Sequence, residues 1–172
     1  MRVARCADVL AQIHGADPRK ARLAGMLHDL ARLYPAKRLI DECELRGMPI
    51  DAFERENPIV LHARLGASLA QESFAVHDPA VLSAIEKHTV AAAVMSPLDC
   101  VVYLADGLEP GRKFAEREAL WRLACTDLHA AMRATLAHSL GYLEREGISA
   151  APQTLAAAKT FGLAEGVSTS LN

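Results

Sequence analysis

Proline follows a residue that can cap a helix at four well-separated places in the chain. The pairs are Asp17-Pro18, Asn57-Pro58, Asp78-Pro79 and Ser96-Pro97. A capping side chain accepts hydrogen bonds from the free amides of a first helical turn, and proline suits the first helical position because its missing N–H is not needed there. Each pair therefore predicts the start of a helix, and together they divide much of the chain into helical segments.

Apolar residues recur with the 3.6-residue period of a helix between these starts. The pattern predicts helices over residues 2–14, 18–33, 36–46, 58–74, 79–88, 97–109, 118–125, 127–146 and 152–161. Gly47 and Gly147 stand where a left-handed C-terminal cap is expected. No segment alternates like a strand over more than a few residues, and aromatic residues make up only 5% of the chain. We therefore predict an all-α fold.

No repeat, low-complexity segment or shift in composition marks a linker. At 172 residues the chain is long enough for one domain with its own core. We predict a single domain over residues 1–162. The last residues, AEGVSTSLN, are small and polar, which predicts a flexible tail over 163–172.

Charge and hydropathy exclude several classes of partner. The formal net charge is −2, whereas a nucleic-acid-binding protein needs a clustered basic face. No apolar run approaches the ~20 residues of a membrane span, and no secretory signal opens the chain. The four cysteines form no CxxC pair and no zinc-finger spacing; they are Cys6, Cys43, Cys100 and Cys125. We expect reduced thiols in a cytoplasmic protein, with no nucleic-acid or membrane partner.

Four of the predicted helices carry ionisable residues at or near positions that the apolar pattern turns inward. His28 and Asp29 stand side by side in AGMLHDLARL, His62 lies in PIVLHARLGASLA, His88 ends AVLSAIEKH, and Asp106 ends CVVYLAD. Burying such groups is costly unless they are paired, hydrogen-bonded or bound to a metal. Each one alone is more often a satisfied core residue, a surface residue or a salt-bridged helix end, so both interpretations stay open for each.

Taken together, these residues favour a metal site. Imidazole and carboxylate are ligands suited to iron, manganese or zinc, and no thiolate belongs to the set. Two ions about 3.5–4 Å apart, bridged by one carboxylate, can activate a water and hold a phosphate. The remaining histidines do not fit this pattern. His14 and His77 lie near helix ends and loops, whereas His129 and His138 lie on the long C-terminal helix, where we expect solvated or half-buried roles.

The order of these motifs resembles the HD-superfamily metal-dependent phosphohydrolases. It resembles most the YqeK branch, whose members are symmetrical diadenosine tetraphosphate hydrolases. The shared landmarks, in order over about residues 3–160, are GADPRKARLAGMLHDLAR, NPIVLHARLGASLA, AIEKHT, MSPLD and YLADGLEPGR. The resemblance implies an HD-domain helical bundle, with a metal-site core over about residues 1–112 and C-terminal helices over 113–162.

The resemblance also implies the ligands of two metal ions. His28, Asp29 and Asp106 match the ligands of one ion, and Asp29 matches a bridge to a second ion held by His62 and His88. We expect two divalent or mixed-valent ions, with iron as the first choice and manganese, cobalt or zinc as alternatives.

Four further residues are expected to take part in substrate binding. Arg112, in EPGR, matches an arginine that contacts phosphate, and with Asp29 it is the expected catalytic residue. Thr89, Lys87 and Glu109 are expected to join Arg112 in binding substrate. A solvated loop arginine remains an alternative for Arg112, and a salt bridge at a helix end is an alternative for Glu109.

The sequence departs from the family pattern at three places. The family begins its site with a histidine four residues before the valine that matches Val3, which predicts that the natural chain starts upstream of Met1. His14 cannot replace this ligand, because it lies eleven residues beyond Val3, some 16 Å along a helix that rises about 1.5 Å per residue. The segment HTVAAAVMS lacks the glycine that the family usually has after HT-x. Arg32, in HDLAR, stands where the family usually has lysine.

The resemblance implies the hydrolysis of diadenosine tetraphosphate into two ADP molecules by a metal-dependent enzyme. Two alternatives follow from the departures. The altered HT segment leaves open a phosphohydrolase that acts on another nucleotide or a phosphomonoester. The absent histidine leaves open a nucleotide-binding protein with an incomplete metal site. A homodimer is an expectation from the family alone.

Overall fold

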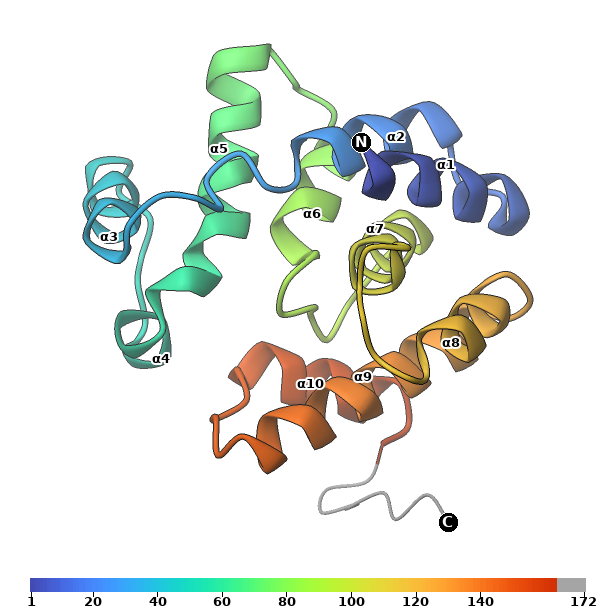
Figure 1. Ribbon diagram of the computed structural model, residues 1–172. Coiled ribbons are helices and arrows are strands. Elements are labelled where there is room, and N and C mark those ends of the chain that lie inside the picture. Colours follow the sequence, from blue (N-terminus) through green and yellow to red (C-terminus); the bar gives the residue numbers. More distant parts are fainter. Residues whose placement is uncertain (164–172) are drawn as a thin grey trace.

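The computed structural model describes residues 1–163, and within that range the chain is helical with no strand (Figure 1). The elements are α1 (Arg2–His14), α2 (Pro18–Leu27), α3 (Ala36–Leu45), α4 (Ala52–Glu56), a 3-10 turn η1 (Pro58–Val60), α5 (Leu61–Phe74), α6 (Pro79–Lys87), α7 (Pro97–Leu108), α8 (Arg117–Ala124), α9 (Leu128–Arg145) and α10 (Pro152–Thr160). The predicted all-α fold is confirmed. Apart from Leu163, the predicted tail over 163–172 lies outside the described residues.

Three of the four predicted caps act as expected. Asp17 accepts hydrogen bonds from two backbone amides at the start of α2, and Asp78 does the same for α6. Ser96 forms a capping box with Asp99 at the start of α7. Asn57 behaves differently: its amide donates to the carbonyl oxygen of Phe53 at 3.0 Å. The chain therefore begins the predicted helix 58–74 with the turn η1 before it enters α5.

Two other predictions need correction. The predicted helix over 18–33 ends at Leu27, and the hydrogen bonds beyond it join residues three apart, as in a 3-10 turn. The helix α4 was missed, although Asp51 and Glu54 form a capping box whose D-x-x-E spacing is visible in the sequence. Gly47 and Gly147 adopt the predicted left-handed conformation, with φ of 65° and 66°.

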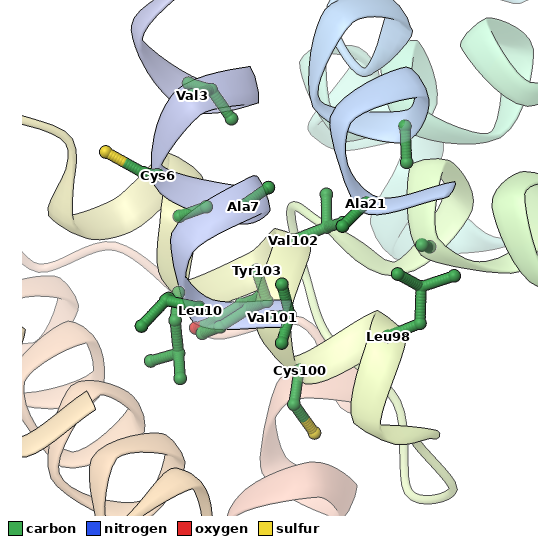
Figure 2. Close-up of a cluster of buried hydrophobic side chains, with 14 of the residues drawn as sticks. Val3, Cys6, Ala7, Leu10, Ala21, Leu98, Cys100, Val101, Val102 and Tyr103 are labelled. Carbon is green, nitrogen blue, oxygen red and sulfur yellow. The ribbon is translucent and has the colours of Figure 1, made fainter. Parts of the chain in front are cut away.

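The helix α7 lies at the centre of the fold, between α1, α2 and α6 on one side and α8 and α9 on the other (Figure 1). Its residues from Leu98 to Ala105 are all buried, and a helix that is apolar on every side belongs in a core. Figure 2 shows Leu10 of α1 beside Val101 and Tyr103 of α7. A smaller apolar cluster, with Leu39 and Leu61, joins α3 to α5. No helix in the described range is long and apolar enough to cross a membrane.

The contact between α1 and α2 depends on a glycine. A Cβ atom on Gly25 would lie 2.9 Å from the Cα atom of Ala4 and 3.1 Å from its nitrogen. Real Cβ atoms do not approach backbone this closely, so any larger residue would push the two helices apart. The first helix also supplies Val3 and Leu10 to the core against α7.

We expect Gly25→Ala to destabilise the protein by about 1–3 kcal/mol, because overpacking against rigid backbone outweighs the better helix propensity of alanine. The matched control is Gly141→Ala in α9, where the Cβ would meet only the end of the Arg145 side chain, at 3.4 Å. That control is expected to stabilise by about 0.5–1 kcal/mol. Urea unfolding monitored by circular dichroism measures both, and equal effects would contradict the close approach.

Candidate metal centre

Each candidate ligand stands at or near a helix end. His28 directly follows α2 and His88 directly follows α6, whereas His62 lies in the first turn of α5. Asp106 is in the last turn of α7. Asp29 follows His28 in the 3-10 turn after α2. Nε2 of His28 lies 3.3 Å from one oxygen of Asp29, so the two adjacent side chains reach the same site.

The three imidazoles converge on the two carboxylates through their Nε2 atoms. One oxygen of Asp29 lies 3.3 Å from Nε2 of His62 and 3.6 Å from Nε2 of His88. Its other oxygen lies 3.3 Å from Nε2 of His28, which is also 3.6 Å from an oxygen of Asp106. The three histidines are nearly buried, and the Asp29 carboxylate is 44% exposed. The structure therefore brings all five predicted ligand residues together in one cluster.

Local hydrogen bonds set the orientation of every ring. In each histidine, Nδ1 lies within hydrogen-bond distance of the backbone carbonyl three residues earlier. The pairs are His28 with Gly25 at 2.9 Å, His62 with Ile59 at 2.5 Å, and His88 with Ile85 at 2.7 Å. A carbonyl oxygen only accepts, so Nδ1 carries the hydrogen and the neutral ring presents its Nε2 lone pair to the cluster.

This arrangement fits a bound cation. The Nε2 atoms of His62 and His88 are 3.2 Å apart, and both face the Asp29 carboxylate. Lone pairs and negative oxygens repel one another at such distances unless a proton or a metal ion lies among them. Two sets of donor atoms each lie within 4.8 Å of one another: His28, His88 and Asp106 form one, and Asp29, His62 and His88 form the other. Imidazole and carboxylate together suit a transition metal.

The pKa shifts of the clustered groups also favour a positive charge among them. Burial lowers the pKa of His28, but the hydrogen bonds with Asp106 and Asp29 outweigh it and raise the pKa to about 9. Burial raises the pKa of Asp29, yet its hydrogen bonds with His28, His62 and His88 bring it far below the usual range. The pKa of Asp106 is also lowered, because the contact with His28 overcomes burial. Both carboxyl groups therefore stay ionised.

Two of the expected substrate-binding residues join the cluster. The hydroxyl of Thr89 lies 3.1 Å from Nε2 of both His62 and His88. Arg112 donates from Nε to the carbonyl oxygen of Asp106 at 3.0 Å and from Nη2 to its carboxylate at 2.6 Å. The Arg112 side chain is 48% exposed and lines the cavity beside the cluster.

The other two lie elsewhere. Lys87 donates to the buried carboxylate of Asp99 at 3.0 Å and lines a neighbouring cavity of about 440 Å³. Glu109 is buried, where it accepts hydrogen bonds from Arg2 and from the Gly111 amide. The geometry thus gives both side chains structural partners, and their roles in substrate binding stay predictions without support from it.

A larger cavity of about 690 Å³ opens onto the cluster. Asp29, His62, His88 and Asp106 line one part of it, together with Arg112. Its other part is formed by the C-terminal helices, which the sequence did not connect with the site. The residues there include Phe114, Thr135, His138, Ser139 and Tyr142. His138 was expected to have no part in the site. Its place beside Phe114 could not be predicted from the sequence, because the two residues are far apart in the chain.

The HTVAAAVMS segment places an alanine, Ala91, in a left-handed backbone conformation. Ala91 is buried and has a φ of 58°, a left-handed conformation that glycine adopts without strain. It stands at the position where the resembling family usually has glycine. The amide of Ala91 donates to the carbonyl oxygen of Lys87 at 3.0 Å, so the turn after His88 keeps its shape despite the alanine.

Comparisons with known proteins agree with this geometry. A family model described as HD domain matches residues 1–111. A Bacillus subtilis (strain 168) protein named bis(5'-nucleosyl)-tetraphosphatase, symmetrical, is 33% identical over 145 residues, covering 84% of this chain and 77% of the relative. A protein of the same name from Halalkalibacterium halodurans is 33% identical, covering 86% and 78%. The crystal structure of a predicted HD superfamily hydrolase involved in NAD metabolism, from Clostridium acetobutylicum, is 32% identical with a TM-score of 0.90, covering 93% and 85%.

We expect the metal-free protein to be stabilised by Mn²⁺ or Fe²⁺. At 100 times the dissociation constant, binding adds about 2.7 kcal/mol, or about 5–10 °C in melting temperature. Asp29→Ala and His62→Ala are expected to abolish the shift, because each removes a central donor. His129→Ala, an exposed histidine on α9, is the control and should retain it. An unchanged shift in both site variants would place the metal elsewhere.

The left-handed alanines give a second prediction. Ala91→Gly is expected to stabilise the protein by about 0.5–1 kcal/mol, since relief of about 1–2 kcal/mol of strain exceeds the entropic cost of glycine. Ala75→Gly is the matched control, because Ala75 is exposed and has a φ of 53° at the end of α5. Thermal unfolding compares them; destabilisation by Ala91→Gly alone would mean that the buried methyl group contributes more than the strain costs.

Proposed function

Because the chain belongs to the HD-domain family, we propose that it is a metal-dependent hydrolase that cleaves diadenosine tetraphosphate symmetrically into two ADP molecules. The observation that carries this proposal is the convergence of three Nε2 atoms on the Asp29 carboxylate at the edge of a cavity that also holds Arg112. The substrate is taken from the names of the relatives that align over most of this chain.

We propose that two ions bind here. His28, Asp29 and Asp106 would hold one, and Asp29 would bridge to another held by His62 and His88. Iron is the first choice, and manganese, cobalt or zinc are alternatives. When bound, the ions supply Lewis acidity, which lowers the pKa of a water molecule and offsets negative charge on the phosphate oxygens. The Nδ1 hydrogen bonds keep the three rings in the ligand orientation without any movement of the helices.

The chain's own residues would position the polyphosphate. Arg112 presents a planar guanidinium beside the cluster, and its N–H groups match two oxygens of one phosphate. The N–H groups that do not donate to Asp106 can donate to the substrate while Nε stays on the carbonyl oxygen of Asp106. Thr89 can donate its hydroxyl to another phosphate oxygen. Hydrolysis adds the hydroxyl of water to one central phosphorus and the proton to the bridging oxygen, so two ADP molecules leave.

We further propose that the protein works in the cytoplasm, where the four cysteines of the chain, all free in the structure, remain reduced. Three of these thiols are buried, and burial raises the pKa of Cys100 to about 12, which makes it a poor nucleophile. A homodimer and the absence of nucleic-acid and membrane partners stay predictions from the sequence.

The first experiment is incubation with diadenosine tetraphosphate under anaerobic conditions with Fe²⁺, Mn²⁺ or Co²⁺, followed by separation of the nucleotides. ADP as the sole product is expected. Asp29→Ala should reduce turnover to background, and Arg112→Ala should lower kcat/KM about 10²–10³-fold because charge on the phosphate is no longer offset. Arg112→Lys should recover part of this loss, since it keeps the charge without the fork.

The control is again His129→Ala, which should match the wild-type rate. ATP with AMP as products would contradict symmetrical cleavage. Full activity of Asp29→Ala would sink the metal-based mechanism altogether.

A further inference from the structure

The larger cavity extends away from the metal cluster to a wall formed by α9 and the segment before α8. Phe114 and His138 meet in this wall with ring centroids 4.5 Å apart and an angle of 27° between their planes. Both side chains are half-buried, so the stacked pair is packed into the protein and still borders the cavity. Tyr142 stands one helical turn beyond His138 and is 49% exposed at the same cavity. The wall therefore carries a stacked aromatic pair and a third aromatic side chain.

A polar group without a partner accompanies this wall. The hydroxyl of Thr135 is buried and has no hydrogen-bond partner among the described residues. Thr135 as a whole is 5% exposed and lines the cavity. An unsatisfied buried hydroxyl costs about 1–3 kcal/mol. A ligand that supplies a donor or an acceptor at this point would remove that cost.

Thr135 also connects the aromatic pair to the metal cluster. Its methyl group would lie 3.8 Å from a Cβ atom built on Gly107, the residue that follows Asp106. Arg112 and Lys113 directly precede Phe114 in the chain, and all three line the cavity. The metal ligands, the cationic side chains, the stacked aromatic pair and Thr135 therefore line one cavity.

We propose that Phe114, His138 and Thr135 form a subsite for the purine base of a nucleotide whose phosphates lie at the metal cluster. The proposal rests on the proposed function for the identity of that nucleotide. A base has a π-face that stacks on aromatic side chains, worth about 1–3 kcal/mol per base. It also has ring nitrogens and exocyclic groups at its edge, which can pair with the Thr135 hydroxyl. An aliphatic ligand would satisfy neither feature.

The charges around the pair fit a neutral base better than a phosphate. Nδ1 of His138 lies 3.8 Å from the carboxylate of Glu116, so an anion at this end of the cavity would meet a negative group. Arg112, by contrast, lies beside the cluster, where it donates to Asp106. The base is therefore expected at the aromatic pair and the phosphates at the metal ligands.

Binding of 1,N6-etheno-ADP tests the subsite directly, because the fluorescence of this base is quenched when it stacks. Wild-type protein is expected to quench it on binding. Phe114→Leu, which keeps an apolar side chain but removes the ring, should raise the dissociation constant of etheno-ADP about 5–150-fold, the equivalent of about 1–3 kcal/mol. Thr135→Val, which replaces only the hydroxyl, should raise the dissociation constant of unmodified ADP by a factor in the same range, because the etheno bridge occupies N1 and N6 of the base. Phe114→Tyr should restore both affinity and quenching.

The chain offers a matched control for the aromatic pair. His129 and Phe161 form another histidine–phenylalanine contact, with centroids 5.1 Å apart and planes at 46°, and neither residue lines the cavity. His138→Ala should weaken etheno-ADP binding, whereas His129→Ala should not. Melting temperatures show whether each variant is folded, and His138→Ala replaces Phe114→Leu if the latter unfolds. Equal behaviour of the two histidine variants would overturn the subsite.

Inorganic pyrophosphate separates the base from the phosphates. Its affinity should be unchanged in Phe114→Leu and Thr135→Val, since it lacks a base; parallel losses for pyrophosphate and the nucleotides would overturn the proposal. With diadenosine tetraphosphate, the same variants should raise KM more than they lower kcat. If the wild type binds etheno-ADP as described yet hydrolyses no dinucleotide, the proposed function fails and the subsite stands. If hydrolysis is normal and binding is unchanged in the variants, the subsite alone fails.

Discussion

Three imidazole lone pairs and two carboxylates meet at one point in this fold, and that meeting is tolerable only with positive charge among them. The rest of the helical arrangement serves to hold it. The helices α2, α5, α6 and α7 each bring one end or one turn to the cluster. The buried central helix α7 fixes Asp106, and the core on both of its sides keeps the ends of its neighbours in place.

Helix ends suit such ligands because they offer backbone carbonyls that can orient the histidine rings. The last carbonyls of a helix lack partners within it, and His28 and His88 use their Nδ1 hydrogens to occupy carbonyls of α2 and α6. One local bond thus satisfies the backbone, sets the tautomer and aims Nε2 at the cluster. Each of these hydrogen bonds joins residues only three apart in the sequence. The ligand types and their spacing could therefore be interpreted as a metal site from the sequence alone.

Features that depend on distant partners could not be predicted in this way. The capping pairs gave the starts of α2, α6 and α7 because a cap acts within three residues. Lys87 looked free for phosphate in the sequence, yet its ammonium meets Asp99 at the start of another helix. Glu109 contacts Arg2, which lies 107 residues earlier in the chain. The early end of α2 was missed because apolar periodicity continues past Leu27, although the hydrogen bonding changes.

Different stretches of the chain form the two parts of the cavity. The residues that match the HD-domain model end at 111 and include all five candidate metal ligands. Phe114, Thr135 and His138 lie beyond that limit, on the segments that close the other part of the cavity. Phosphate chemistry and recognition of the organic part of a substrate would then be carried by separate stretches of sequence. A metal cluster built on helix ends of the matched region can keep its geometry while the C-terminal helices change, so substitutions in α9 should alter which nucleotide binds before they alter how its phosphates are cleaved.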